Sequence, residues 1–499
     1  MLNLGVSMAI GVFFTPYLLR CLGKSLYGLI PLSNTVVSYL AVATAGLQIA
    51  VSRFVATALE QGDEEGASRI FSTATLGLFG VAALLTIPLG LLSWRGDWIL
   101  RVPQENIADL RYLLAYCGAS FLVSTVTSSF GVSLFYRNRF DIQHWISLGS
   151  NLLRVGLTVL AFSLVSPRLW HVGMAILAAG VAVGIGNLVT WRNLTPHLVF
   201  RVRLWKQAEF NRIIQTAGWV LIAQVGTILL VGIDLLVVNR LFGPVANTQY
   251  AVALQWSVLL RGLASTLATL FGADITALNA RGNLPGLIAY TRKSNKFMGL
   301  VLALPVGLIC GLSRPLLHTW VGAEYLGIAP LMVVLTLPLA VNLAYLPLHN
   351  VSLATNRVKW PGIMQIAFGA VNLALALVLG RFTPLGMYGV AIAGGLVLTL
   401  RNLLWTPIYA AHILDQPWGT FMKEVLPCLL AAIGVSLVGW ALSFFWYPVG
   451  WPALGCAAAV VGVAYCATSY AVLFSPVERR EARLRIASLI PWFRFPPAA

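Results

Sequence analysis

Five charged residues lie inside long apolar stretches of this sequence: Arg53, Arg154, Asp234, Arg261 and Arg401. A charge deep in a membrane-spanning helix costs about 2.5–3.5 kcal/mol on insertion scales, so such residues usually face a cavity and mark function. Arginine presents a planar fork of donors that contacts phosphate in a bidentate way and stays protonated. The excess of arginine over aspartate predicts a cationic cavity for an anionic group and disfavours a cationic substrate.

The five residues differ in their depth within the apolar stretches. Arg154 and Arg261 lie midway along theirs, which favours a binding role. Arg53 and Arg401 lie nearer the predicted cytoplasmic end, where a long side chain can equally extend to lipid headgroups. Asp234 either pairs with a neighbouring arginine or takes part in transport, and the sequence leaves both open. All five are predicted substrate-binding residues.

The apolar stretches that carry these residues determine the fold class. Of 499 residues 59% are hydrophobic and 10% charged, against roughly 25% charged in soluble domains, which excludes a soluble enzyme. Because a helix needs about 20 apolar residues to cross a bilayer, we predict an all-α polytopic membrane protein with about fourteen spans. They cover approximately 3–21, 27–52, 70–93, 110–135, 142–166, 170–190, 214–239, 249–273, 295–317, 326–352, 361–380, 386–410, 425–446 and 452–474.

The position of the basic residues explains the net charge of +17. In a soluble protein this charge would suggest nucleic acid, but most of the 33 Lys and Arg residues fall in loops on one side of the predicted spans. The positive-inside rule then predicts cytoplasmic N and C termini in the cytoplasmic (inner) membrane. The basic tail around Arg479 to Arg485 is expected on the anionic inner leaflet. No nucleic-acid partner is predicted.

The two halves of the chain repeat similar landmarks at an offset of roughly 220 residues. Arg20–Gly23 matches Arg240–Gly243, and Arg137–Phe140 matches Arg357–Trp360. Each half would have six helices in the same orientation, an arrangement of transporters whose substrate site lies between the repeats. Arg53 and Arg261 then come from equivalent helices. The predicted domains are an N-terminal lobe (1–200), a C-terminal lobe (201–415), two additional spans (416–475) and the basic tail (476–499).

Other chemistry has no support in the sequence. The six cysteines form no CxxC pair and have no histidine at metal spacing, so they are interpreted as packing residues. Nothing resembles a Walker loop, a metal cluster or a nucleophile elbow, and the largest outer loop, 94–109, is too short for a catalytic domain. We therefore predict no cofactor, no metal and no enzymatic activity.

Several short motifs resemble bacterial polysaccharide transporters. Arg20-Cys-Leu-Gly-Lys-Ser-Leu-Tyr-Gly28 is similar to their "R-x-L-G-x-x-x-Y-G" start, and Asp234, Gly243 and Tyr250 to their "D … G … Y" pattern. The likeness continues at Arg53-Phe54-Val55-Ala56, at Pro315-Leu316-Leu317 with Trp320, Gly322 and Tyr325, and at Ala354-Thr355-Asn356-Arg357. The chain resembles Wzx-type oligosaccharide flippases of the multidrug/oligosaccharidyl-lipid/polysaccharide exporter superfamily over nearly its whole length.

This resemblance implies two six-helix lobes that alternate between inward-open and outward-open states. The implied cargo is a glycan on an undecaprenyl pyrophosphate carrier, for polysaccharide or lipopolysaccharide biosynthesis, with membrane lipids and other polysaccharide-assembly proteins as further partners. A lipid II flippase stays an open alternative. A multidrug exporter of the same superfamily predicts acidic residues in the spans of the first lobe, and the chain has none there. A membrane glycosyltransferase or polymerase is disfavoured by the short outer loops.

Overall fold

The computed structural model describes residues 2–423 and 425–473, and over these residues the chain is helical, with no strand. The α-helices are α1 (Leu2–Leu22), α2 (Leu29–Leu40), α3 (Val42–Glu60), α4 (Glu64–Ile99), α5 (Ile107–Thr127), α6 (Val132–Tyr136), α7 (Phe140–Leu164), α8 (Leu169–Leu194), α9 (Gln207–Thr227), α10 (Asp234–Ala280), α11 (Leu284–Gly311), α12 (Ser313–Trp320), α13 (Ala329–Thr336), α14 (Leu339–Asn342), α15 (Leu346–Ala354), α16 (Lys359–Phe382), α17 (Met387–Leu400), α18 (Thr406–Ile413), α19 (Leu426–Phe445) and α20 (Trp451–Thr468). Short 3-10 or π-helical segments are η1 (Gln104–Asn106), η2 (Ser128–Gly131), η3 (Val202–Leu204), η4 (Ile228–Gly232), η5 (Ala323–Ile328), η6 (Arg401–Trp405) and η7 (Ser469–Leu473). The all-α prediction is confirmed, and the predicted basic tail lies outside the described residues.

Among the residues that the structure describes, 12 segments are long and apolar enough to cross a membrane. The chain is thus a polytopic membrane protein, as predicted. The count of fourteen stays a prediction for two reasons. Leu221–Ala280 is one segment by length, although its helix is interrupted at Gly243, where φ is 84°. The predicted span 27–52 falls on two helices, and α2 alone, at 1.5 Å per residue, is about 18 Å long and too short to cross the ~30 Å hydrocarbon core.

Prolines within the apolar stretches lie either inside a helix or between two helices. Pro88 and Pro305 lie inside α4 and α11. Pro338 instead lies between α13 and α14. The predicted span 326–352 is found in part: Ala323–Asn342 is one of the 12 segments that could cross a membrane, and α15 follows as a separate helix. Proline has no N–H for the helix ladder and clashes with the preceding turn, which accounts for a break at this residue.

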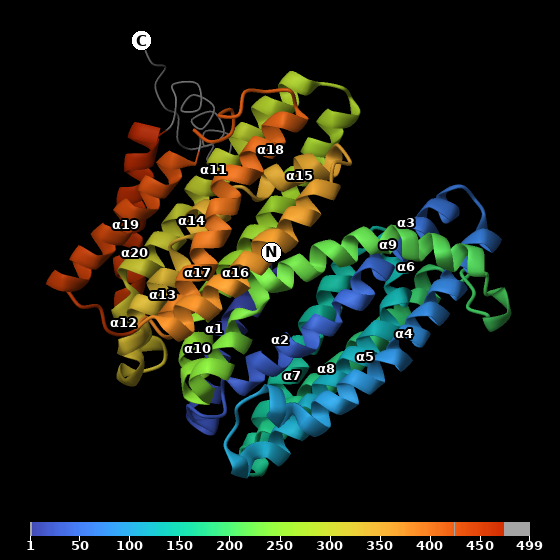
Figure 1. The fold of residues 1–499 in the computed structure, drawn as a ribbon, viewed down its shortest axis with the longest axis horizontal. Helices are drawn as coiled ribbons and strands as arrows, with labels where there is room; N and C mark the ends of the chain where they lie inside the picture. The colour runs from blue at the N-terminus through green and yellow to red at the C-terminus, as the bar shows by residue number, and fades with distance from the viewer. Residues whose placement is uncertain (1, 424, 474–499) are drawn as a thin grey trace, which may run out of the picture. The chain divides into compact units, whose positions relative to one another are not determined.

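The described chain forms two compact units, one of residues up to Leu263 with Ser352–Arg401, the other of Ala264–Val351 with the part from Asn402 onward. These units are defined by contacts between residues and do not test the predicted lobes, which stay a prediction. In the first unit α5 packs between α4 and α8, and α8 also packs on α7, in the blue-to-teal bundle of Figure 1. Phe71, Phe130 and Trp191 form an aromatic cluster in its core, with ring centroids 5.0–5.7 Å apart.

The segment between α8 and α9 is bonded to α4 by hydroxyl groups. Ser68 Oγ accepts from Val199 N at 3.1 Å, Ser72 Oγ from Arg201 N at 3.1 Å, and Thr73 Oγ1 from Lys206 N at 3.1 Å. This segment contains the predicted boundary between the lobes at residue 200. The hydroxyls therefore fix the path of the chain from the first predicted lobe to the second.

In the second unit α11 packs closely on α19. A Cβ placed on Gly299, Gly307 or Gly311 would lie 2.5 Å from Cys428 Sγ, Val435 Cβ or Ser436 O, respectively. Small residues allow two helices to approach this closely, and in lipid such packing replaces the hydrophobic effect as the force between helices. The residues 425–446, predicted as an additional span, are therefore part of the core of this unit.

Candidate functional site

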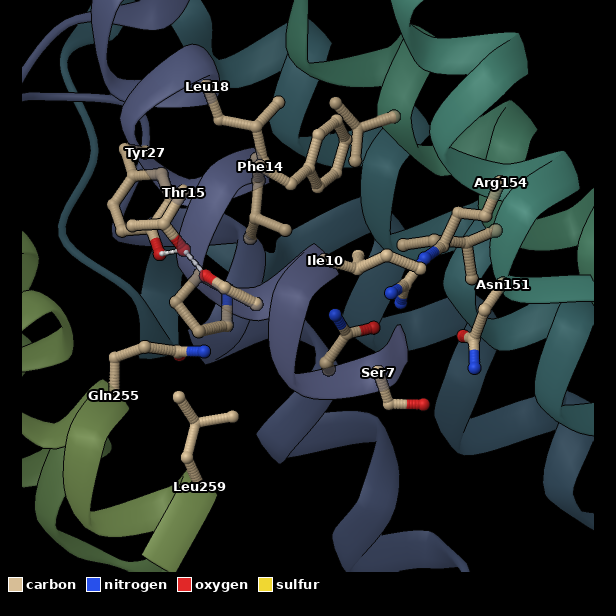
Figure 2. Close-up of a pocket in the computed structure, with 16 residues that line it drawn as sticks. Ser7, Ile10, Phe14, Thr15, Leu18, Tyr27, Asn151, Arg154, Gln255 and Leu259 are labelled. Atoms are coloured by element: carbon tan, nitrogen blue, oxygen red, sulfur yellow. Dashed lines mark hydrogen bonds between the residues drawn. The ribbon is translucent and has the colours of Figure 1, made fainter. Parts of the chain in front are cut away.

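A cavity of about 260 Å³ lies among helices of the first unit, and Arg154 is the charged residue in its wall. The wall is formed by α1, the α1–α2 turn, α2, α7, α8 and α10 (Figure 2). Its lining residues are Ser7, Ile10, Gly11, Phe14, Thr15, Leu18, Tyr27, Ile30, Pro31, Asn34, Asn151, Arg154, Val172, Ile176, Gln255 and Leu259. None of them is acidic, so no lining residue offsets the charge of Arg154. We call this cavity the Arg154 pocket.

Arg154 lies midway along α7, and its side chain extends from that helix into the pocket in Figure 2. Its Nε atom is buried without a hydrogen-bond partner among the described residues. Burial of an ionised donor without a partner is costly, and the cost is removed when an anion accepts from the guanidinium. This arrangement suits a phosphate group, as the residue type suggested.

Amide and hydroxyl side chains surround the guanidinium. Asn151 precedes Arg154 by one turn on α7, and Ser7 and Gln255 come from α1 and α10 (Figure 2). Asn34 comes from α2. A Cβ on Gly11 would lie 2.9 Å from Gln255 Nε2, so glycine at this position leaves room for that amide. Such groups both donate and accept hydrogen bonds, as sugar hydroxyls require. The pocket is smaller than the roughly 300–1,000 Å³ of typical ligand sites, which fits a phosphate with an adjoining sugar better than a whole oligosaccharide.

Asp234 and Arg261 both lie on α10, and neither lines the Arg154 pocket. The buried Asp234 carboxylate accepts from Tyr250 Oη at 3.1 Å through Oδ2. A Cβ on Gly394 would lie 3.3 Å from Asp234 Oδ2 and 3.8 Å from Asn372 Oδ1, which places both side chains beside α17. Asp234 and Arg261 form no ion pair among the described residues, so both alternatives that the sequence left open for Asp234 stay predictions.

Arg401 and Arg53 lie in two further places. Arg401 begins the π-helical segment η6, is buried, and donates from Nη2 to Gln365 Oε1 at 2.8 Å. Gln365 in turn donates to Thr227 Oγ1 at 2.7 Å, which links α16 to α9. Arg53 is exposed near the end of α3. Of the five predicted site residues, the structure places Arg154 in the lining of the pocket and places Arg53, Asp234, Arg261 and Arg401 outside that lining.

Sequence reasoning missed the amide residues of the pocket. Asn34, Asn151 and Gln255 all lie within predicted spans, where an uncharged amide also carries a desolvation cost. The spacing of Asn151 and Arg154, three residues apart on one helix, places both on the same face. An inspection of polar as well as charged residues within the spans would have found them.

These features define a class of protein: a multi-pass, all-helical membrane protein with polar and charged groups in its interior. Residues 1–271 match the family model described as "Polysaccharide biosynthesis protein". The chain is also 31% identical over 475 residues to the uncharacterized membrane protein EpsK of Bacillus subtilis (strain 168), which covers 95% of this chain and 94% of that protein. The chain belongs to this polysaccharide biosynthesis protein family.

Two solved structures share the fold at low sequence identity. The lipid II flippase MurJ in an inward closed conformation matches 94% of this chain and 99% of its own, with a TM-score of 0.62 and 16% identity. A multidrug resistance MATE family transporter of the MOP superfamily in an inward-facing conformation matches 82% of this chain and 94% of its own, with a TM-score of 0.59 and 16% identity. The chain therefore shares the helical fold of these two proteins.

Proposed function

We propose that this protein moves a lipid-linked oligosaccharide across the cytoplasmic membrane by alternating access. The cargo would be a glycan on undecaprenyl pyrophosphate, and the sugars of that glycan stay unspecified. The observation that carries the proposal is the Arg154 guanidinium, whose Nε is buried without a partner in a pocket of amide and hydroxyl groups. Family membership and the shared fold of a lipid II flippase support the same class of cargo.

In this mechanism the pyrophosphate pairs with Arg154 while the first sugar bonds to Asn151, Asn34 and Gln255. The remaining sugars and the lipid tail lie outside the small pocket. Arg261 and Arg53 are proposed to contact the pyrophosphate during its passage, and Asp234 to compensate Arg261 when no cargo is bound. Arg401 is proposed to act by holding α16 on α9 through Gln365. Transport needs no covalent step and no cofactor.

Alternating access requires contacts that break when one end opens. Gly28 N donates to Thr248 Oγ1 at 2.9 Å, and Asn247 Nδ2 donates to Gly28 O at 2.8 Å. Tyr39 Oη also donates to Gly232 O at 2.7 Å. Each bond joins the predicted first lobe to the predicted second lobe within the first unit. Gly28, Asn247 and Thr248 lie beside loops predicted to be extracytoplasmic, so this structure corresponds to a state closed at that end.

The test is transport by the purified protein in liposomes that contain undecaprenyl-pyrophosphate-linked glycan. Arg154→Gln is expected to lower the transport rate at least tenfold, because about 1.4 kcal/mol of lost phosphate binding is a factor of ten. Arg154→Lys keeps the charge and should retain part of the activity. The matched control is Arg139→Gln, which removes an exposed arginine paired with Asp141. Normal transport by Arg154→Gln contradicts the proposed site.

A lipid II cargo is the second candidate, because the fold is shared with a lipid II flippase. The same liposomes loaded with lipid II separate the two candidates. Transport of lipid II at a rate equal to that of the oligosaccharide carrier would favour the broader activity. Growth of a strain depleted of its lipid II flippase when this protein is expressed would have the same meaning.

A further inference from the structure

A second cavity, of about 460 Å³, lies in the first unit away from the Arg154 pocket, and half of its lining residues are arginines. It is lined by Arg101, Arg240, Leu241, Phe242, Gly380 and Arg381. All three arginines are exposed, so a ligand can reach them directly. None of the six lining residues is acidic. We call this cavity the three-arginine cavity.

Three different chain segments bring these arginines together. Arg101 follows α4, and its backbone is held by Asn239, whose side chain accepts from Arg101 N at 2.8 Å and donates to Arg101 O at 3.3 Å. Arg240 lies in α10, three residues before the helix is interrupted at Gly243. Arg381 lies in the last turn of α16, after Gly380, whose added Cβ would meet Leu241 Cδ1 at 3.2 Å. The side chains of Asn239 and Leu241, on either side of Arg240, therefore bring the three segments together.

The three arginines differ from the neighbouring Arg111 in that no carboxylate pairs with them in the described part of the chain. Arg111 pairs with Asp97 at 3.8 Å, and the Arg95 guanidinium lies over the rings of Trp94 and Trp98 at 5.1 and 4.6 Å. In the described part of the chain no ion pair is formed by Arg101, Arg240 or Arg381. Arg101 Nη1 donates to Leu241 O at 3.3 Å, and Arg381 lies 5.8 Å from the Phe382 ring.

Local helix electrostatics explains only part of this arrangement. A cation in the last turn of a helix is favoured by the helix dipole, which accounts for Arg381 and, before the break at Gly243, for Arg240. It does not account for Arg101, which lies outside any helix. Nor does it account for three like charges around one cavity, because their mutual repulsion disfavours the arrangement. An anion in the cavity removes that repulsion.

We propose that the three-arginine cavity is a binding site for a phosphate or pyrophosphate group at the end of the protein predicted to be extracytoplasmic. Guanidinium groups match phosphate oxygens in a planar, bidentate geometry, and a cavity of this size holds a pyrophosphate with its water. The ligand group belongs either to a phospholipid headgroup or to the carrier lipid of the cargo. The site is distinct from the Arg154 pocket, with which it shares no lining residue.

The position of the cavity gives the bound anion a consequence for the transport cycle. Arg101 belongs to the predicted first lobe, while Arg240 and Arg381 belong to the predicted second lobe. Opening at this end would separate Arg101 from the other two and dismantle the site. A phosphate bound there consequently favours the state closed at this end, because a ligand shifts an equilibrium toward the conformation that binds it better.

The first experiment is titration of inorganic pyrophosphate into the full-length protein in phosphatidylcholine nanodiscs, followed by calorimetry and by the melting temperature. Arg101→Gln and Arg381→Gln are each expected to weaken binding about tenfold, or ~1.4 kcal/mol, and the double variant is expected to abolish the rise in melting temperature. Arg95→Gln is the control, since it removes an arginine of the same predicted side that lies over tryptophan rings. Unchanged affinity in the double variant overturns the proposal.

Arg154→Gln separates the two anion sites. Loss of pyrophosphate binding in Arg154→Gln, with none in Arg101→Gln or Arg381→Gln, would assign the anion to the Arg154 pocket and overturn the proposal. Retained binding in Arg154→Gln supports it. Pyrophosphate binding does not depend on transport, so its failure is distinguishable from failure of the proposed function.

Two lipid arms identify the source of the phosphate, and only the carrier-lipid arm rests on the proposed function. Nanodiscs are prepared with phosphatidylglycerol or with undecaprenyl pyrophosphate, and the apparent affinity for inorganic pyrophosphate is measured in each. Weaker binding with phosphatidylglycerol identifies a phospholipid headgroup, and weaker binding only with undecaprenyl pyrophosphate identifies the carrier lipid. Competition by neither lipid overturns the assignment to a lipid phosphate.

Discussion

The contact of Gly28 with α10 gives the most direct test of alternating access. Gly28 donates to Thr248 Oγ1 and accepts from Asn247 Nδ2, and both partner side chains are fully buried. Thr248→Val keeps the shape of the side chain but leaves the Gly28 N–H without its acceptor. Gly28→Ala acts differently, because its Cβ would lie 2.5 Å from Thr248 Oγ1 and 2.7 Å from Thr248 N. Both substitutions are expected to destabilise the state closed at this end.

The expected size follows from the cost of a buried group that loses its partner. This cost is about 1–3 kcal/mol in the closed state, and it vanishes in the open state, where water reaches Gly28. A shift of this size changes the equilibrium by a factor of about 5–150. If the closed state is favoured about 99:1, the open population rises from about 1% to between about 5% and 60%.

The assay is a distance measurement by pulsed electron resonance between spin labels at Glu105→Cys and Phe382→Cys, in a background whose six cysteines are replaced. Both positions are exposed and come from opposite predicted lobes. Thr248→Val and Gly28→Ala should each increase the population at long distance. The control, Thr57→Val, removes a hydroxyl bonded to Arg53 O within α3. Identical distance distributions in both variants and the unmodified protein would refute alternating access at this contact.

Three further predictions concern stability, each measured by the melting temperature in detergent. Tyr250→Phe removes the donor to the buried Asp234 carboxylate and should cost about 1–3 kcal/mol; in a double-mutant cycle with Asp234→Asn the two effects should not add. Gln365→Leu removes the link between Arg401 and Thr227 and should cost a similar amount, and an effect below 0.5 kcal/mol would show that the link is dispensable. Gly307→Leu would collide with Val435, where overpacking costs about 1–3 kcal/mol, whereas Gly434→Leu, with nothing within 4 Å, should be neutral.

The sequence predicts the architecture well because lipid imposes a simple rule. Backbone groups in hydrocarbon must bond internally, so apolar stretches of sufficient length become helices. The rule does not predict breaks within a span: Pro338 lies between α13 and α14, although Ala323–Asn342 as a whole is long and apolar enough to cross a membrane. Hydropathy does not distinguish a proline inside a helix, such as Pro88, from one that ends it.

The candidate site is less predictable, because a charge in a span indicates a cost without identifying what offsets it. Arg401 donates to Gln365, which lies 36 residues away in the sequence, and Asp234 accepts from Tyr250, which lies 16 residues away. Arg154 differs because its guanidinium forms no hydrogen bond or ion pair with another residue in the described part of the chain, and its Nε is buried. Residue type and depth alone placed Arg154 and Arg261 in the same category, and only tertiary contacts separate them.

The motifs that carried the family resemblance gain a physical explanation from the structure. Tyr27 lines the Arg154 pocket and Gly28 contacts Asn247 and Thr248 so closely that a side chain would collide. In the second motif Gly243 adopts a φ of 84°, and Tyr250 donates to Asp234. Glycine alone tolerates both demands on the backbone. Motif residues that have little specificity in the sequence alone are thus required by the structure, through a close contact, a strained backbone conformation or a buried hydrogen bond.

The predicted duplication is supported by the local geometry of matching turns. Asp63 accepts from Gly66 N at 2.7 Å at the start of α4, and Asn283 accepts from Gly286 N at 3.0 Å at the start of α11. Their backbone angles nearly coincide, with φ and ψ of −85° and 77° for Asp63 and −82° and 75° for Asn283. Each also follows a glycine of positive φ. Side-chain capping is common, but the same sequence of preceding bonds and angles in both halves is what descent from one ancestral unit would produce.

A second pair of turns indicates a different register for the proposed duplication. Asn138 and Asn356 both have a φ of 55°, a left-handed conformation that asparagine tolerates better than most residues. In both turns the next residue bonds back five positions, Arg139 N to Leu134 O and Arg357 N to Ser352 O. Arg139 therefore corresponds to Arg357, whereas the sequence alone aligned Arg137 with Arg357. The offset between the halves is two residues shorter here than at Asp63 and Asn283, so the proposed duplication requires a deletion of two residues between these turns in the second half or an insertion in the first.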